Sequence, residues 1–523
     1  MASSFYENLY TSQGTIGMEE VLSHIPARVD AGMNARLNAP YTNEEVKVAL
    51  FQMFPTKTSG PDGFPAHFFQ RHWELCGEEV TSMIIRLLNG EDSPEDINRT
   101  FIVLIPKIAS PKILGQFWSI SLCNVIYKIA SKILANRLKI ILPEVISEEQ
   151  SAFVPGRLIT DNFITADECL HYMKSRRIKS NRFCALKLDM MKAYDRLEWS
   201  YLKAVMLKMG ISPRFTETVM RCVSSVSFSV LFNGGIMDDF RPSRGLRQGD
   251  PISPYLFLIA AEGLSCLPKA ENIGVQGLAV APTAPSVNHL LFADDSLLFF
   301  EATRASTEKV RDLLKMYCDA SGQRINTDKS SIYFSKMVQE PQRNEIKLLL
   351  DVHNEALTDK YLWLPTDVGK AKEGCFRYLK DRIWKQVQGW KEKALSVGGK
   401  EVLIKSVAQA IPTYSMACFK LPRGLCQHIN GLLRKFWWGS KKGERKTAWV
   451  SWDVMTQPKF MGGMGFRDIE LFNLALLARQ AWRLLQEPNS LSARILKAAY
   501  YPSVSILDAE LGKNPSQVWR SLV

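Results

Sequence analysis

The chain contains 523 residues, of which 66 are Lys or Arg and 53 are Asp or Glu, so its formal net charge is +13. This excess favours a polyanionic partner, because Lys and Arg that neutralise phosphates release condensed counterions, although charge alone does not separate nucleic acid from an acidic membrane. Apolar runs fall short of the roughly 20 residues that cross a bilayer, and the N-terminus lacks a signal-peptide pattern. These features exclude a membrane-spanning or secreted protein and indicate an intracellular one.

The length allows three or four domains at about 150 residues each. Ten cysteines are scattered without a CxxC pair or a Cys/His cluster. We therefore expect core thiols, and neither a structural zinc site nor a disulfide framework. Residues 1–40 carry short amphipathic pieces without a chemical signature, whereas FIVLIP predicts a strand that ends at Lys107. A lysine in this place is often simply solvated.

A strand and then a helix are predicted from residue 183 onwards. In FCALKLD the alternation places Leu186 and Leu188 on one side of a strand, and Asp189 ends the strand pointing away from that apolar face. Apolar residues then recur at helical spacing until a glycine supplies the stop. These residues are Leu202, Val205, Met206, Met209 and Gly210.

The segment SRGLRQGDPISPYLF (243–257) contains two glycines and two prolines, which enforce a turn-rich loop before an apolar helix. Small residues in such a loop let the backbone approach a ligand closely. A plain junction between a loop and a helix explains the same composition, so both interpretations stay open here.

Asp294 and Asp295 stand side by side in HLLFADDSLLFF, a pattern that predicts a β-hairpin with a polar tip from Ala293 to Ser296. Adjacent acids in an apolar setting are costly unless a cation neutralises them. If the strand ending at Asp189 lies beside this hairpin, Asp189 and Asp294 converge as oxygen ligands for Mg²⁺. Two such ions about 3.5–4 Å apart would suit nucleotide polymerisation. An Asp pair in a turn is also common for its backbone hydrogen bonds.

Beyond residue 340 the pattern becomes helical and basic. One helix is predicted to combine an apolar stripe with an opposing charged face, and Gly389 is expected to limit it. The stripe is Leu379, Ile383, Val387 and Trp390, and the charges are Lys380, Arg382, Lys385, Lys391 and Lys393. This helix could follow a duplex backbone.

Two further C-terminal segments are of interest. In 434–452 basic residues alternate with four tryptophans, which suits base stacking and phosphate binding, yet Trp437 and Trp438 could equally be core residues. A helix over 471–485 is predicted to be a packing element. Its expected apolar face is Leu474, Ala478, Ala481 and Leu485.

Motifs that resemble those of one known family occur in order along nearly the whole chain. They are TSGPDGFPAHFF (58–69), NRTFIVLIPK (98–107), ISLCNVIYKIASKILANRLK (120–139), EEQSAFVPGRLITDN (148–162), ALKLDMMKAYDR (185–196), SRGLRQGDPISPYLF (243–257), HLLFADDSLLF (289–299), GQRINTDKSSIYFS (322–335), YLWLP (361–365), KFWWGS (435–440), GGMGFRDIELFNLALLARQAWRL (462–484) and KAAYYP (497–502). With these motifs the chain resembles the reverse transcriptases of plant non-LTR retrotransposons, the long interspersed (LINE-type) elements.

The resemblance implies an α/β (α+β) fold of the right-hand polymerase type, with fingers, a palm built on an antiparallel sheet with helices, and a helical thumb. The implied parts are a linker remnant at 1–40, fingers at 41–180, the palm at 181–340, a thumb-like helical region at 341–440 and a C-terminal helical extension at 441–523. It further implies an RNA-directed DNA polymerase that takes an RNA template, a DNA primer and deoxynucleoside triphosphates. Two Mg²⁺ ions, or Mn²⁺, are the expected cofactors.

Roles for single residues also follow from the resemblance. Asp189 and Asp294 would hold the metal ions with Asp295 supporting them, and Lys107 would reach the triphosphate. Tyr194 would reject a 2′-hydroxyl on the nucleotide sugar, although a core aromatic residue is the plainer interpretation. Three other residues, Arg247, Gln248 and Gly249, would line or adjoin the nascent base-pair pocket. Lys329 would protonate the departing pyrophosphate, although lysines after turns are ordinary.

Departures from the family pattern predict a truncated and partly degenerate copy. Trp118 replaces an expected arginine on the triphosphate, Met191 stands where Ser is usual, and Trp363 replaces a glycine near the primer. Motifs of an endonuclease or RNase H are missing, so target cutting would need another nuclease. The alternative is a catalytically silent nucleic-acid-binding remnant. A metal nuclease fits poorly, because it leaves Tyr194 and the 243–257 loop unexplained. The family's habit of copying into chromosomes favours a nuclear site, with a cytoplasmic one as the alternative.

Overall fold

The computed structural model describes residues 2–175, 182–270, 274–355, 360–366, 372–391, 395–441, 444–445 and 447–523. Helices and antiparallel-rich sheets are mixed along this part of the chain, which makes the fold class α/β. Within these ranges, no helix has both the length and the apolar character required to cross a membrane. Seven of the ten cysteines are buried, as expected for core thiols.

Within the described ranges the strands form two four-stranded sheets and two short hairpins. The order in the first sheet is β2-β1-β4-β5, and the order in the second is β6-β7-β3-β8. The strands are β1 Arg99–Pro106, β2 Phe117–Cys123, β3 Phe183–Leu188, β4 Ser227–Phe232, β5 Gly235–Ile236, β6 His289–Phe292, β7 Asp295–Glu301, β8 Ser331–Phe334, β9 Lys360–Tyr361, β10 Leu364–Pro365, β11 Ser440–Lys441 and β12 Glu444–Arg445.

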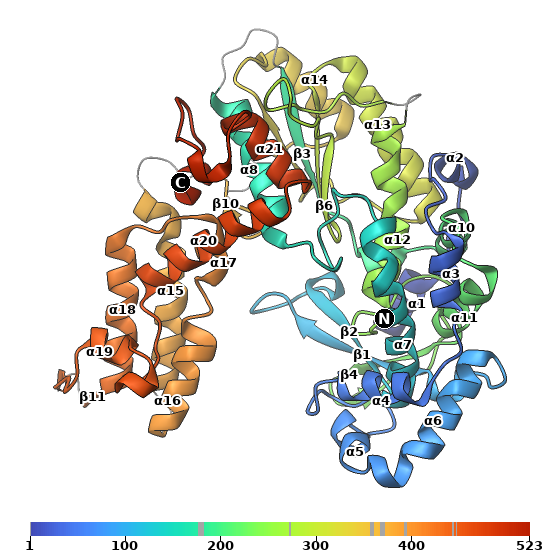
Figure 1. Cartoon of the computed structure of the whole chain (residues 1–523). Coiled ribbons are helices and arrows are strands. Elements are labelled where there is room, and N and C mark those ends of the chain that lie inside the picture. Colours follow the sequence, from blue (N-terminus) through green and yellow to red (C-terminus); the bar gives the residue numbers. More distant parts are fainter. Residues whose placement is uncertain are drawn as a thin grey trace.

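Helices surround the sheets and make up most of the C-terminal third (Figure 1). The helices are α1 Ala2–Tyr10, α2 Met18–Ser23, α3 Ala31–Leu37, α4 Asn43–Phe51, α5 Ala66–Arg71, α6 Trp73–Asn89, α7 Val125–Val145, α8 Ile159–Ser175, α9 Ala193–Arg196, α10 Trp199–Lys208, α11 Pro213–Ser224, α12 Ser253–Cys266, α13 Arg304–Ser321, α14 Glu340–Leu350, α15 Lys372–Lys391, α16 Val397–Leu403, α17 Thr413–Cys418, α18 Arg423–Trp438, α19 Trp452–Thr456, α20 Ile469–Gln486, α21 Leu491–Tyr500 and α22 Trp519–Leu522.

The second sheet separates two hydrophobic cores. On β3, Leu186 and Leu188 point into one core while Ala185 points into the other. On β7, Leu298 and Phe299 alternate in the same way. Because successive strand residues point to opposite faces, a sheet covered on both sides needs the nearly continuous apolar runs found in these strands.

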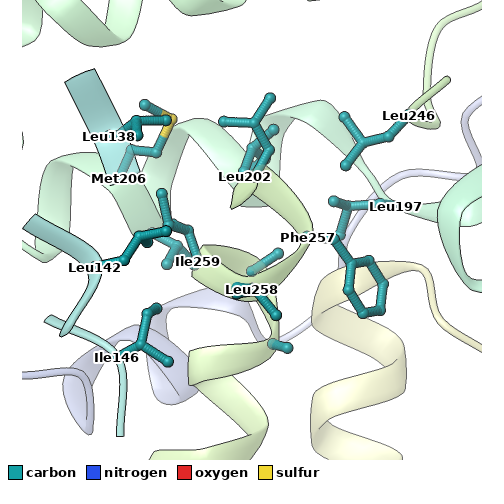
Figure 2. Packing of buried hydrophobic residues seen from close by; sticks show 14 of the residues in the cluster. Leu138, Leu142, Ile146, Leu197, Leu202, Met206, Leu246, Phe257, Leu258 and Ile259 are labelled. Atoms are coloured by element: carbon teal, nitrogen blue, oxygen red, sulfur yellow. The ribbon is translucent and has the colours of Figure 1, made fainter. Parts of the chain in front are cut away.

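The first core joins the second sheet to α7, α10 and α12. In Figure 2, Leu138 and Leu142 of α7 lie near Met206 of α10 and Ile259 of α12. All four predicted residues of the α10 stripe are fully buried, which confirms that prediction. Burying each such side chain contributes about 1.5–3 kcal/mol, so this layer helps to hold the second sheet in place.

The N-terminal segment, for which a linker was expected, is packed into the folded body. Tyr6 and Tyr10 are buried, and their core also contains Ile102 and Phe228 from the first sheet. The Tyr10 hydroxyl donates a hydrogen bond of 2.8 Å to Asp195. The partner surfaces lie at least 90 residues away in the sequence, so local patterns in residues 1–40 could not predict this packing.

The second core contains α8, one face of the second sheet and the C-terminal helices. The predicted stripe on α15 is confirmed, and the helix continues past Gly389, so Trp390 is buried at the end of the stripe. The side chains of Lys391 and Lys393 lie outside what the structure describes. Trp437 and Trp438 pack at the edge of this core, which favours the core interpretation for both. Residues 442, 443 and 446 of the tryptophan-rich segment are also outside the described ranges.

The predicted packing face of α20 is wrong. The buried residues are Ile469, Asn473, Leu477, Gln480 and Leu484, whereas Leu474 is 44% exposed. The error arises because the true face contains two amides, and a search for apolar residues passes over them. The Asn473 amide donates to the carbonyl oxygens of Met416 and Phe419 at 2.8 and 2.9 Å, so its burial is compensated.

A buried carboxyl group lies where the C-terminal residues meet α8. Glu168 accepts hydrogen bonds from the Tyr500 hydroxyl at 2.6 Å and from the Ser516 hydroxyl at 2.5 Å. Burial raises the pKa of Glu168 to about 7, even though these two donors oppose the rise. The folded state therefore binds a proton that the unfolded state has already released at neutral pH.

Stability is expected to fall between about pH 4.5 and pH 7 because of this group, since the unfolded chain ionises first as the pH rises. Glu168→Gln removes this contribution. The free energy of unfolding of the variant, relative to that of the wild type, should therefore be higher at pH 8 than at pH 4 by on the order of 1–3 kcal/mol. Thermal unfolding at both pH values measures the difference. The exposed Glu144→Gln is the matched control, and an equal pH response in both variants would contradict the assignment.

Candidate active site

The pairing of β3 with β7 brings two distant carboxylates together. In the antiparallel register Leu188 lies opposite Ser296, so Asp189 leaves β3 beside the start of β7. Strands β6 and β7 form the predicted hairpin, with Phe292 paired to Asp295. The predicted hairpin is confirmed, and the condition for Asp189 and Asp294 to converge is met, because the strand before Asp189 lies beside that hairpin.

The tip of the hairpin is shorter than predicted. Because Phe292 pairs with Asp295, the loop consists of Ala293 and Asp294 alone, and Ala293 has φ 55°. Gln150, a buried residue that the sequence did not single out, accepts a hydrogen bond from the Ala293 N–H at 3.0 Å. Its amide nitrogen also donates to the Ala293 carbonyl oxygen at 3.4 Å. Gln150 thus supports the left-handed backbone that presents Asp294.

A second loop is fixed to the backbone of Asp189. The N–H of Asn326 donates to the Asp189 carbonyl oxygen at 2.8 Å, and the Asp189 N–H donates to the Ser330 hydroxyl at 3.2 Å. Lys329 lies within this loop. These contacts place Lys329 near Asp189, although 140 residues separate the two in sequence.

The β1–β2 hairpin contributes Lys107, the second lysine that was predicted for the site. Lys107 follows β1, and its N–H donates to the Gln116 carbonyl oxygen at 2.8 Å. Its ammonium group lies 3.4 Å from the Gly115 carbonyl oxygen. Trp118 is on β2 opposite Ile105, and half of its side chain is exposed.

These elements enclose a cavity of about 830 Å³. The predicted site residues that line it are Lys107, Asp189, Tyr194, Gln248, Asp294 and Lys329. Two residues that depart from the family pattern, Trp118 and Met191, line it as well. Residues that the sequence did not single out also line it, and they are Phe5, Asn8, Leu9, Gln13, Lys192, Arg196, Arg244 and Arg324, among others. The basic ones could have been noticed beside the motifs, whereas no local signal connects α1 with this cavity.

The cavity joins clustered carboxylates to clustered cations. Burial, and then the nearby charge of Asp189, raises the pKa of Asp294, although its side chain stays accessible to solvent. Burial and then the charges of Lys192 and Lys329 lower the pKa of Lys107. Each group is therefore held close to like charges. A ligand that carries a cation would offset the repulsion between the carboxylates, and its phosphates would offset the repulsion between the lysines.

Tyr194 occupies the cavity wall beside the acids. Its ring stacks on Phe257, with centroids 4.8 Å apart and planes 8° apart. Burial, and then the charge of Asp294, raises the pKa of its hydroxyl. The stack leaves the ring little freedom to rotate, so Tyr194 presents a fixed surface next to Asp294.

The 243–257 loop divides its predicted roles among three residues. Gln248 lines the cavity, and its carbonyl oxygen accepts from the Ser121 N–H at 2.9 Å. Gly249 has φ 119°, and a Cβ there would lie 2.9 Å from the Ser121 carbonyl oxygen, so this turn requires glycine. Arg247 points elsewhere. Its guanidinium group is buried in an ion pair of 2.7 Å with Asp250.

Asp295 differs from Asp294 in its surroundings. It is the first residue of β7, and side chains of successive strand residues point to opposite faces. Burial raises its pKa, and the charge of Lys187 opposes this rise. Burial, and then the charge of Asp295, raises the pKa of Tyr361. Asp295 therefore lies behind the cavity wall that Asp294 faces.

Trp363 lies at the turn of the β9–β10 hairpin. Leu362 and Trp363 have φ values of 45° and 67°, and the Trp363 side chain is 82% exposed. Such a turn ordinarily contains Asn or Gly, because other residues are strained there. Tyr361 anchors the hairpin by donating a hydrogen bond of 2.8 Å to Asn162.

Trp363→Gly is expected to stabilise the protein by about 0.5–1 kcal/mol, since relief of the left-handed strain exceeds the extra entropy of an unfolded glycine. Chemical denaturation measures the change. Trp449→Gly is the matched control, because Trp449 is equally exposed at 82% but has no positive φ. Equal destabilisation of both variants would show that the turn at Trp363 is not strained.

The donor set in the cavity suits a divalent cation. Among the described residues no group of three or more His, Cys, Asp or Glu side chains is placed to hold a metal by itself. Asp189 and Asp294 nevertheless face one cavity, and Mg²⁺ typically uses one or two carboxylates together with substrate phosphates and water. Two acids beside several lysines therefore fit a metal that arrives with a polyphosphate.

Comparison with known proteins identifies the family. Residues 105–378, just over half of the chain, match the family described as reverse transcriptase (RNA-dependent DNA polymerase). The chain belongs to this family. Reverse transcriptases generally use a divalent metal ion, in agreement with the carboxylates found here.

Several of its relatives are named as proteins of transposable elements. It is 27% identical over 513 residues to an uncharacterized 149 kDa protein of transposon TX1 from Xenopus laevis, covering 96% of this chain and 38% of that protein. It is 28% identical over 301 residues to the Pol polyprotein of the R2DM retrotransposable element from Drosophila melanogaster, covering 56% of this chain and 26% of that one. An uncharacterized mitochondrial protein of Arabidopsis thaliana is 40% identical over 115 residues, covering 22% of this chain and 75% of that protein. These matches make the chain the reverse transcriptase domain of a non-LTR retrotransposon, and it spans well under half of the TX1 and R2DM proteins.

Proposed function

We propose that this domain copies RNA into DNA by two-metal nucleotidyl transfer onto a primer 3′-hydroxyl. One observation carries the proposal. A single cavity is lined by two carboxylates, three lysines and the ring of Tyr194, drawn from segments as far apart as Lys107 and Lys329. The expected partners are an RNA template, a DNA primer and deoxynucleoside triphosphates. Copying into chromosomal DNA would place the protein in the nucleus or, before import, in the cytoplasm.

Asp189 and Asp294 hold the cations that accompany the nucleotide, with Asp295 supporting them from behind. Bound Mg²⁺ supplies activation of the primer hydroxyl and neutralisation of the departing pyrophosphate. Lys107 contacts the triphosphate, and Lys329 donates a proton to the leaving pyrophosphate. Catalysis by such a site consists mainly of positioning and electrostatic stabilisation.

The remaining predicted residues set specificity. Tyr194 lies under the nucleotide sugar and excludes a 2′-hydroxyl. Gln248 borders the nascent base pair, while Gly249 gives the backbone its turn and Arg247 fixes the loop through Asp250. Support for this division comes from the stacked Tyr194 ring and the contacts of Gln248 and Gly249 with Ser121.

We assign the second sheet with its helices to the palm, the β1–β2 hairpin with α4 to α7 to the fingers, and α15 to α18 to the thumb. In Figure 1 the C-terminal helices and the α4–α6 region lie on opposite sides of the molecule, as template-gripping parts would. Trp384, which is 51% exposed, and Arg382 and Lys385 lie on the outer face of α15, where a duplex backbone could contact them.

A catalytically silent, nucleic-acid-binding remnant is the second candidate. The observation in its favour is Trp118, which places an indole on the cavity wall where the family has a guanidinium group. An arginine there would add a charge-assisted contact of about 1.5–3 kcal/mol.

Primer extension on poly-rA with oligo-dT and Mg²⁺ separates the candidates. Extension that requires both Mg²⁺ and deoxythymidine triphosphate supports the polymerase. Retained template binding without any extension supports the silent remnant, and nuclease cleavage of the template in place of extension would reject both.

A further inference from the structure

Lys192 is a cation of the cavity wall to which the proposed function gives no role. It lies between Asp189 and Tyr194 and precedes α9, with φ 55°. Its side chain is only 13% exposed. The ammonium group lies 3.4 Å from the carbonyl oxygen of Phe117, the residue before Trp118 on β2. Lys192 thus extends across the cavity from the catalytic loop to the strand that lacks its arginine.

We propose that Lys192 binds the triphosphate of the incoming nucleotide, together with Lys107 and Lys329, and supplies the positive charge that is missing at position 118. This proposal rests on the proposed function, because it concerns the substrate of the same site. It adds a third phosphate-binding cation from a different segment of the chain.

A purely structural role explains the contacts of Lys192 less well. The only carboxylate paired with it among the described residues is Asp195, at 3.8 Å, which is too long for a hydrogen bond. Asp195 already accepts bonds from the Tyr10 hydroxyl at 2.8 Å and the Ser119 hydroxyl at 3.2 Å. An ammonium group has three donors. The long Phe117 contact leaves Lys192 with donor capacity for an anion.

The charges around Lys192 point to the same ligand. Burial, and then the nearby charges of Lys192 and Lys329, lower the pKa of Lys107, so the three cations lie close together. Three neighbouring cations are stable together when an anion lies between them. The carboxylates of Asp189 and Asp294 line the same cavity, which orients a polyphosphate with its bound cation toward the acids and its free oxygens toward the lysines.

Nucleotide affinity tests the proposal without requiring catalysis. A complex of the protein with RNA template and a dideoxy-terminated primer binds the incoming nucleotide but cannot extend, so the dissociation constant can be measured by titration. Lys192→Gln is expected to weaken nucleotide binding about 10-fold, and Lys192→Arg should retain most of the affinity. Inorganic tripolyphosphate, used as a competitor, should lose affinity for Lys192→Gln by a similar factor, because the contact is to phosphates.

Position 118 provides an internal check. Trp118→Arg should raise nucleotide affinity more in the Lys192→Gln background than in the wild type, since both cations serve the same phosphates. Lys203→Gln is the matched control, because Lys203 lies nearby in sequence but forms an exposed pair with Glu217. Melting temperatures identify any variant that fails to fold, and Lys192→Met, which keeps the aliphatic stem, then replaces Lys192→Gln.

Several results would overturn the proposal. They are an unchanged nucleotide affinity in Lys192→Gln, an equal loss in Lys192→Arg, and an equal gain from Trp118→Arg in both backgrounds. Nucleotide binding by the wild type without extension of a normal primer would reject only the polymerase and leave the Lys192 site supported. Failure of the wild type to bind any nucleotide would overturn both.

Discussion

Asp294→Asn is expected to reduce primer extension by about 10³-fold or more, because charge stabilisation by a metal site contributes several kcal/mol to such a reaction. The asparagine keeps the size of the side chain but removes the charge that balances a cation. Asp294 forms half of the two-residue tip and faces the cavity, so the substitution should leave the fold intact. Single-turnover extension on poly-rA, with binding of the template measured in parallel, gives the rate.

Asp312→Asn is the control for this experiment, since Asp312 is an exposed acid on α13. It should extend primers at the wild-type rate. Extension by Asp294→Asn at more than a tenth of that rate would mean that Asp294 is not a metal ligand. Equal loss of template binding would instead show that the change acts through the fold.

Tyr194→Val should raise the use of ribonucleotides relative to deoxyribonucleotides roughly 10- to 100-fold, the range expected when a close steric contact is removed. The Tyr194 ring is held by its stack on Phe257 and cannot move aside for a 2′-hydroxyl. Valine removes most of the ring and opens that space. Extension with each nucleotide in turn, compared as kcat/KM, measures the ratio.

Tyr255→Val serves as the matched control. Tyr255 is a partly buried tyrosine on α12 that packs against the first core, so its loss should change stability and leave the ratio unaltered. An unchanged ratio in Tyr194→Val would assign the ring to packing alone, which is the plainer interpretation of its sequence.

Local patterns predicted the elements of the site well. The alternation before Asp189, the hairpin around Asp294 and the helical spacing from Leu202 to Met209 all reappear in the structure. These patterns succeed because side-chain periodicity directly reflects which face of an element is buried. The prediction for α20 was wrong for a related reason, because its buried face includes Asn473 and Gln480. Their burial depends on partners elsewhere in the chain.

The hairpin tip shows a second limit. Asp294 and Asp295 are equivalent in composition, and both were placed in a four-residue turn. The register that pairs Phe292 with Asp295 puts only Asp294 in the turn, and Gln150 stabilises that turn from another segment. A strand register is determined by all the side chains packed on its two faces, which a short motif does not contain.

The sequence by itself determined which residue types are present and in what order, namely paired acids, basic residues and an aromatic residue at the spacings of a reverse transcriptase. Only the tertiary structure decided which of these groups meet. In the structure Arg247 forms a buried ion pair, and Asp294 but not Asp295 lines the cavity. Lys192 and residues of α1 also line the cavity. The physical reason is distance along the chain. Periodicity and turn signals act over a few residues, whereas the cavity is assembled by packing between segments hundreds of residues apart.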